Sequence, residues 1–308
     1  MANFIDVVTQ SATIIDAYNT EALFAFQPER HFDRVAEVIS PKYSLTGNGA
    51  SAVFTIYSNI AVNTGVMNST ATTITPDKTI TSSQKSITLD AYGDFLTLDT
   101  FELEAASFMD QLAVTATTLG FQAGQSIDLL SRSVFDGNTA AAYAANASGY
   151  SYGGTLADIH AEDVRSAFAH LDSSNIPKVD GLHYFAIAHP NVIATLRSEV
   201  GEGAWRTPME YRSDSMLHVA GELGAWEGFR WISTANTWKN TAANPEYHTY
   251  FTGKDAIGRV VPKGLQIKSH GPYGPFNNLI VVNWSVFGGW GELRPEALYK
   301  IRSTAKYD

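Results

Sequence analysis

The stretch Asp99–Phe135, DTFELEAASFMDQLAVTATTLGFQAGQSIDLLSRSVF, says more about the fold than any other part of the chain. Its apolar residues recur every three or four positions, the spacing of one face of an α-helix. This stripe comprises Phe101, Ala105, Phe108, Leu112, Ala116, Leu119, Ala123, Ile127, Leu130 and Val134. Asp99, followed three residues later by Glu102, matches a helix-capping pair. The pattern predicts one helix over 99–135, roughly 55 Å long at ~1.5 Å per residue.

Glycines and acids interrupt this helical pattern. Gly120 and Gly124 lower helix stability, which predicts either a break or a point of close packing. The acidic residues of the stretch have little compensating charge nearby, and we interpret them as a solvated face; they are Glu104, Asp110 and Asp128.

The segments before the helix lack a core of their own. Residues 1–50 resemble an arm, whose Phe24, Phe26 and Phe32 pack either on the same chain or on a neighbour. Two strand-like runs, 51–58 and 86–92, flank a Thr/Ser/Asn-rich stretch over 63–83 and predict a long β-hairpin. Because a two-stranded hairpin is marginal alone in water, we expect it to lie across another molecule.

Residues after the helix alternate between helical and strand patterns. A Gly/Ala/Asn/Tyr-rich connection is expected over 136–155, followed by a helix over 157–171 and a buried strand over 183–188. Pro190 occupies the first-turn position that proline prefers, so a second helix is expected over 191–199. Short strands then lead to two closing strands, over 279–287 and 292–302. This mixture predicts an α+β fold.

Composition favours a surface covered by other protein. The chain of 308 residues has only 17% charged residues, no cysteine and a net charge of −10, which argues against a free-standing nucleic-acid binder. Residues 259–308 carry a net charge of +4 and the first 258 carry −14. The basic residues of the closing segment either meet acidic surface on neighbouring subunits, which we favour, or face a polyanion. They are Arg259, Lys263, Lys268, Arg294, Lys300, Arg302 and Lys306. A signal peptide and a membrane span are not expected.

No catalytic, cofactor-binding or metal-binding residue is expected. The eight histidines are dispersed without metal-ligand spacing, and phosphate-binding and nucleophile motifs are absent from the sequence. Glu222 and Glu227, near Trp205, Trp226 and Trp231, are the only pair that could suggest glycoside hydrolysis. We interpret them as surface acids beside packed indoles, with a carbohydrate-active enzyme as a remote alternative.

Three local sequences resemble one family, the major capsid proteins of tailed bacteriophages with the Hong Kong 97-like fold, and most of all the branch typified by the coliphage N-four capsid protein. The first is Tyr92–Phe101, YGDFLTLDTF, at the hairpin-to-helix junction. The second is Tyr184–Pro190, YFAIAHP, with Thr195–Arg197, TLR, and the third runs from Phe276–Leu279, FNNL, to Arg294–Leu298, RPEAL. The resemblance implies an N-terminal arm (1–50), an extended hairpin loop (51–95), a peripheral domain with a spine helix (96–154), an axial domain (155–270) and a return to the peripheral domain (271–308).

The resemblance also implies a structural rather than enzymatic function. The expected chain self-assembles, as hexamers and pentamers, into an icosahedral shell around double-stranded DNA that it contacts weakly and non-specifically. Expected partners are a scaffolding protein, a portal and a possible decoration protein, without a membrane; the shell is assembled in the bacterial host cytoplasm. An encapsulin-type compartment is the nearer alternative. Lys78 and Lys85 lie in the hairpin, as in members that cross-link neighbouring subunits, but the acceptor is not matched and that activity is not carried over.

Overall fold

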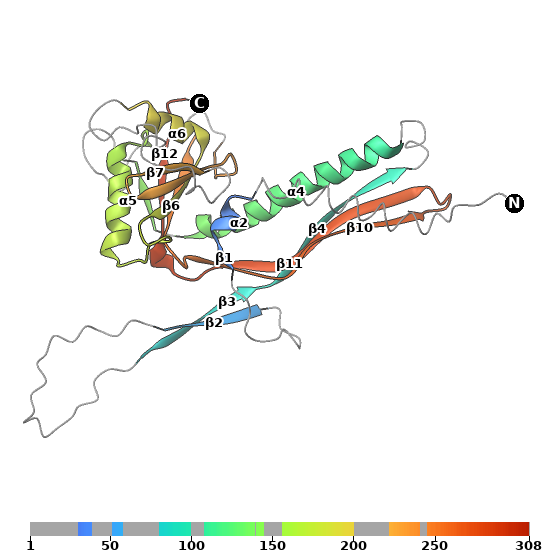
Figure 1. The fold of residues 1–308 in the computed structure, drawn as a ribbon, viewed down its shortest axis with the longest axis horizontal. Helices are drawn as coiled ribbons and strands as arrows, with labels where there is room; N and C mark the ends of the chain where they lie inside the picture. Colours follow the sequence, from blue (N-terminus) through green and yellow to red (C-terminus); the bar gives the residue numbers. More distant parts are fainter. Residues whose placement is uncertain are drawn as a thin grey trace, which may run out of the picture.

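Two sheets and a separate two-stranded ribbon organise the chain. The computed structural model describes residues 30–38, 51–57, 80–99, 108–138, 140–144, 156–199, 222–240 and 245–307. A body built on a six-stranded sheet lies at one end of a long layer formed by helix α4 and a four-stranded sheet (Figure 1). The ribbon leaves the junction between them and points away from the long layer (Figure 1).

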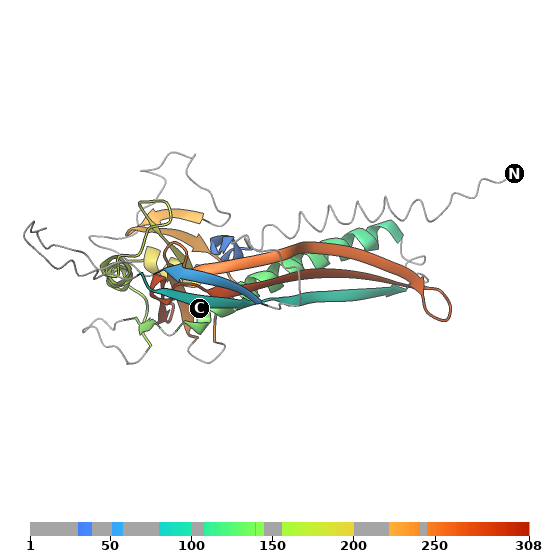
Figure 2. The same ribbon diagram turned by 90° about the horizontal axis from the view of Figure 1, so that it is seen from below.

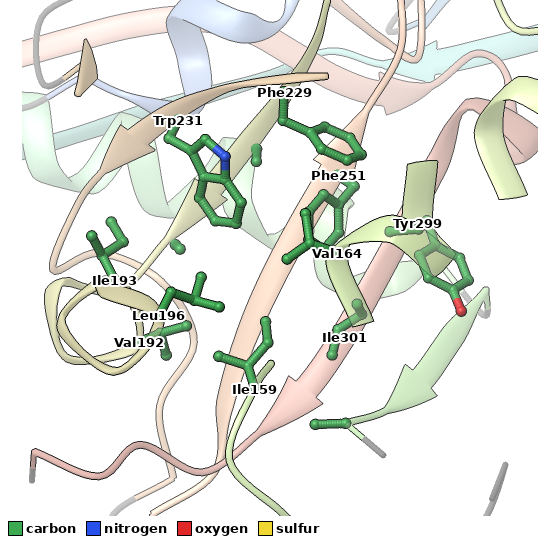
Figure 3. Packing of buried hydrophobic residues seen from close by; sticks show 14 of the residues in the cluster. Ile159, Val164, Val192, Ile193, Leu196, Phe229, Trp231, Phe251, Tyr299 and Ile301 are labelled. Atoms are coloured by element: carbon green, nitrogen blue, oxygen red, sulfur yellow. The ribbon is translucent and has the colours of Figure 1, made fainter. Parts of the chain in front are cut away.

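The six-stranded sheet combines strands from distant parts of the sequence. Its order is β5 (Ala141–Tyr143), β12 (Leu298–Ser303), β9 (Tyr247–Thr252), β6 (Tyr184–Ala188), β8 (Phe229–Ser233) and β7 (Glu222–Trp226). Helices α5 (Ala161–Ser173) and α6 (Pro190–Arg197) pack against it, and the core between them is apolar and aromatic (Figure 3). All five residues of β6 are buried, as expected for a central strand.

Local sequence explains both helices of this body. The backbone N–H of His160 donates to the Asp163 carboxylate over 2.9 Å, which caps the start of α5. At α6, Pro190 stands in the first turn and the His189 ring accepts a hydrogen bond from the Asn191 backbone. The predicted α6 is confirmed, while α5 starts at Ala161, four residues later than expected, because its cap lies at His160.

The long layer is an amphipathic helix resting on one face of a sheet. Its sheet has the order β1 (Glu37–Val38), β10 (Ile257–Tyr273), β11 (Leu279–Glu292) and β4 (Asp90–Asp99). Helix α4 (Phe108–Gly137) lies along it (Figures 1 and 2). The predicted stripe is confirmed from Ala116 to Ile127, whose side chains are buried against Ile267 and Trp284. The side chains of stripe residues 101–112 lie outside the described part.

The predicted start of the long helix is wrong. Asp99 is the last residue of β4, opposite Leu279 of β11, and its carboxylate accepts a hydrogen bond from the Asn278 amide. Pairing with β11 extends the strand to the residue at which the helix was expected to begin, and Glu102 lies outside the described part. Of the two alternatives for Gly120 and Gly124, the break is wrong, because both lie inside the continuous α4; their burial agrees with the other alternative, a point of close packing.

Strands cross the domain boundaries that the sequence suggested. Strand β4 passes residue 95 and β10 passes residue 270, because both extend along β11. The closing segment 271–308 divides, with β11 in the long sheet and β12 in the six-stranded sheet. The predicted connection 136–155 contains β5, which pairs in parallel with β12. Such pairings join residues far apart in sequence, so composition along the chain does not reveal them.

Candidate functional site: the ribbon and the junction that holds it

The most conspicuous surface feature is the projecting ribbon of β2 (Ser51–Tyr57) and β3 (Ser82–Thr88). The strands pair antiparallel from Ser51 opposite Thr88 to Tyr57 opposite Ser82, which confirms the predicted hairpin with its second strand shifted toward the tip. Val53, Tyr57 and Ile80 are 52%, 67% and 60% exposed. A two-stranded ribbon with apolar side chains in solvent lacks the burial that would stabilise it alone. The tip, residues 58–79, lies outside the described part.

Among the described residues of the ribbon, the buried ones lie at its base. Ala52, Ile87 and Leu89 form a small core with Val260 and Leu293. Here the ribbon crosses β11 at Gly289 and Gly291. The backbones of two strands can come into contact in this way where one strand has no side chain between them. A Cβ atom on Gly289 would overlap the Thr88 carbonyl oxygen, and one on Gly291 would lie 2.7 Å from the Ile87 side chain. The glycines therefore determine how closely the ribbon sits on the sheet.

A buried carboxylate joins the segment before the ribbon to the long helix. Asp128 of α4 accepts hydrogen bonds from the backbone N–H groups of His31 (2.8 Å), Phe32 (2.6 Å) and Asp33 (3.2 Å), at the start of the short helix α2 (Phe32–Val35). The Asn236 amide donates to its other oxygen over 2.9 Å. Burial raises the pKa of Asp128, while the Asn236 hydrogen bond opposes that shift. The predicted solvated role of Asp128 is wrong, because α2 covers this part of the helix.

A second buried carboxylate, Asp33, holds α2 to the long sheet. It forms ion pairs with Arg30 and Arg259, and the Trp290 indole donates to it over 2.7 Å. The pKa of Arg30 is lowered to about 10, mainly by burial and secondly by repulsion from Arg259. Arg259 is therefore engaged within its own chain, which corrects the expectation that it meets a neighbouring subunit.

Phe32 anchors α2 by aromatic packing. Its ring is fully buried, with ring centroids 5.2 Å from Phe135 and 5.3 Å from Tyr250 in edge-to-face arrangements. The alternative of packing on the same chain is thus correct for Phe32. Phe24 and Phe26 lie outside the described residues.

Lys300 is also committed to the interior of its own chain. It is 5% exposed, its ammonium donates to the Asp136 carbonyl over 2.7 Å, and burial lowers its pKa. Arg302 stacks over Tyr143 at 5.5 Å and lies 3.7 Å from Glu246. Charge at Lys300 serves the fold, so the expectation that it faces a neighbour is wrong.

Comparison with protein families gives this architecture its identity. A family model described as phage capsid protein matches residues 82–301, more than half of the chain. The chain belongs to the phage capsid protein family. The matched residues include the ribbon strand β3, the long layer except β1, and nearly the whole six-stranded sheet, so the capsid family covers most of the elements described above. No curated protein matches this capsid protein.

Solved capsid structures share its fold. The capsid of Ralstonia phage GP4 superposes with a TM-score of 0.68 at 13% identity, covering 91% of this chain and 92% of that one. Mycobacterium phage Che8 gives 0.61 at 14% identity, covering 88% and 90%. A virus-like particle from Pyrococcus furiosus gives 0.55 at 14% identity, covering 94% and 99%. The capsid protein has the α+β Hong Kong 97-like fold that its sequence predicted.

The two carboxylates of the enzyme alternative are each held by an arginine. Glu222 has a fully buried side chain and accepts from the Arg230 guanidinium over 2.9 Å. Glu227 lies in the turn after β7 and pairs with Arg165 over 3.0 Å. Glu222 is thus buried, against the prediction of a surface acid. Trp226 and Trp231 pack together, with ring centroids 5.8 Å apart, while Trp205 lies outside the described residues.

The other features considered in the sequence were metal ligands, membrane spans and the hairpin lysines. Within the described ranges, His, Asp and Glu side chains form no group of three that could hold a metal ion. None of the described helices has the length and hydrophobicity of a transmembrane span. Lys85 lies on β3 opposite Phe54, and Lys78 is outside the described residues.

Proposed function

We propose that this capsid protein self-assembles into a closed icosahedral shell that encloses the double-stranded DNA genome of a tailed bacteriophage. The family match over residues 82–301 carries the proposal. The exposed ribbon supports it, because its apolar side chains require a partner that the described residues of the same chain do not supply. In a shell, neighbouring copies cover such a ribbon and complete its burial.

The proposed division of labour follows the two sheets. The body on the six-stranded sheet would act as the axial domain of hexamers and pentamers, and the long layer as the peripheral domain between them. Assembly in the host cytoplasm with a scaffolding protein and a portal, and with a decoration protein where one binds, completes the proposal. A structural role of this kind requires no catalytic residue, in keeping with the arginine-paired Glu222 and Glu227.

DNA would be contacted weakly and non-specifically. With a net charge of −10, the average field of the subunit repels phosphate, and only local basic groups touch it. We expect unassembled subunits to bind DNA with a dissociation constant of about 10⁻⁴ M or weaker at physiological salt. A fluorescence titration measures this, and sub-micromolar affinity would contradict it.

Electron microscopy of the purified protein tests the main proposal. Closed shells are expected for the wild type, and discrete monomers or small oligomers at every concentration would contradict it. Tyr57→Asp should abolish shells while leaving the subunit folded, because this ribbon side chain is exposed in the single chain. Tyr307→Asp is the matched control, since Tyr307 is 50% exposed but lies away from the ribbon and should leave shells intact.

An encapsulin-type shell is the second candidate, favoured by the likeness to the virus-like particle from Pyrococcus furiosus. The contents of purified particles separate the two. Nuclease-protected DNA supports the phage capsid, and protein cargo without DNA supports the compartment.

A further inference from the structure

The face of helix α4 that points away from the sheet is exposed. Val114, Thr118, Phe121 and Gln125 recur every three or four residues, so they share one face of the helix. All four are exposed, and the exposed fractions of Val114 and Phe121 are 64% and 45%. Successive residues of a helix are about 100° apart, which puts this outer face about half a turn from the buried stripe that packs on the sheet.

The outer face has the composition of a covered surface. From residue 111 to residue 127 the chain contains no Asp, Glu, Lys, Arg or His. A helix face in water ordinarily carries charged and polar side chains, whereas this one presents a valine and a phenylalanine beside a threonine and a glutamine. The composition therefore favours a face on which another segment lies.

The N-terminal part of the chain reaches α4 on this same face. Asp128 continues the spacing of Phe121 and Gln125, and its carboxylate accepts hydrogen bonds from the backbone N–H groups of His31 and Phe32. Figure 1 shows α2 against the end of α4 nearest the body, with most of the helix extending beyond it. The chain that precedes α2 is therefore fixed at the point where the exposed face begins.

The sequence just before this anchor has the pattern and the length to cover the face. Residues 12–26 carry an apolar stripe at helical spacing, and their two acidic residues fall outside it. The stripe consists of Ile15, Tyr18, Ala22 and Phe26. As a helix these residues would span about 22 Å, and residues 114–128 of α4 span about 21 Å. Pro28 would end such a helix before α2 begins.

We propose that residues 12–26 form an amphipathic helix that lies along the outer face of α4 of the same chain, with Ala22 and Phe26 packed around Phe121. The two helices run parallel, because residue 26 must stay near the Asp128 end of the face. Val114 lies at the far end and forms the rim of the contact. The contact buries an apolar face within one subunit, so it is independent of the proposed shell function.

The covalent connection favours the segment of the same chain over that of a neighbour. Residues 27–29 separate the proposed helix from the anchored Arg30. A segment on so short a linker has an effective concentration on the order of millimolar at its site. In dilute unassembled subunits, the segment of a second copy cannot compete with that concentration.

Disulfide trapping tests the contact, because the chain has no cysteine of its own. Ala22→Cys is combined in turn with Thr118→Cys and with Gln125→Cys on the outer face. At least one of these pairs should form a disulfide about tenfold faster than Ala22→Cys combined with Ser133→Cys. Ser133 is exposed on the same helix but lies beyond α2, away from the proposed contact. Peptide mass spectrometry of dilute unassembled subunits measures the rates.

Mixing ¹⁵N-labelled with unlabelled subunits before oxidation identifies the source of the segment. Disulfides within one label support the proposal. Disulfides that join labelled to unlabelled chains would overturn it and assign the face to the segment of a second copy. Rates equal to that of the Ser133 pair for both outer-face pairs would overturn the contact and leave the shell function intact.

Digestion with chymotrypsin tests the same contact without cysteines. Phe121→Asp places a charge under the segment and should speed cleavage after Tyr18 and Phe26 by about tenfold or more, because cleavage follows the population of the open form. Phe276→Asp is the matched control, since Phe276 is 81% exposed in the turn between β10 and β11 and should leave the cleavage rate unchanged. Circular dichroism checks that both variants fold. Equal cleavage rates in wild type and Phe121→Asp would contradict the contact.

Discussion

Replacing Asp128 by alanine should detach the segment at α2 from the long helix. Three of the four donors to this carboxylate, the Phe32 and Asp33 backbone N–H groups and the Asn236 amide, are buried and cannot turn to water. An unsatisfied buried donor costs about 1–3 kcal/mol. Removing the buried carboxylate offsets part of the summed cost of the three unsatisfied donors, because the desolvation of the carboxylate is itself unfavourable. The expected net loss is about 3 kcal/mol in the free energy of unfolding.

Urea denaturation of unassembled subunits measures this loss, and the midpoint of thermal unfolding should fall on the order of 5 °C. Asp128→Asn retains one acceptor oxygen and should cost only about 1 kcal/mol. Asp172→Ala is the matched control, because Asp172 is exposed and its ion pair with Lys178 should contribute about 0–1 kcal/mol. The reasoning fails if Asp128→Ala unfolds within about 0.5 kcal/mol of wild type, as ordinary surface substitutions do.

Four further outcomes follow from the same contacts. Gly289→Ala should lower both unfolding stability, by about 1–3 kcal/mol, and particle yield, because its methyl group displaces the ribbon; unaltered shells would contradict this. Leu119→Ala should cost about 2–5 kcal/mol in urea denaturation, whereas Val114→Ala, at a 64% exposed position on the same helix, should cost little; equal losses would refute the assigned face. Lys300→Glu should destabilise the unassembled subunit by about 3–5 kcal/mol, because it buries an unpaired carboxylate and removes the donor to the Asp136 carbonyl oxygen; a stable subunit that only fails to assemble would restore an intersubunit role. Burial raises the folded-state pKa of Asp128, so stability relative to Asp128→Asn should be greatest below the ordinary carboxyl pKa of about 4 and decline as pH rises through the raised value; a difference that grows with pH would reverse the sign.

Local sequence patterns predicted most of the helices and strands. The stripe that includes Leu119, the β-branched runs of the ribbon and the buried run Tyr184–Ala188 each depend on neighbours a few positions away, so periodicity reveals them. The order of these parts, with three short matching sequences, also indicated the capsid fold. Low charge and the absence of a catalytic constellation favoured a structural role.

Partners distant in the sequence could not be read from those patterns. Asp99 has the spacing of a helix cap, yet β11 takes it into a strand. The sequence pattern indicated a solvated position for Asp128. In the structure α2, about a hundred positions earlier in the chain, covers it. Lys300 alternates like any strand residue, and only the packing of β12 against the end of α4 buries its ammonium.

The sequence by itself therefore determined most of the elements, because helix and strand propensity and amphipathic spacing act over a few residues, and its resemblance to a known family indicated the class of protein. The tertiary structure alone decided which charges are buried and which remain exposed. Burial and pairing of a charge depend on the groups that surround it in space, and β-pairing brings those groups together from opposite ends of the chain.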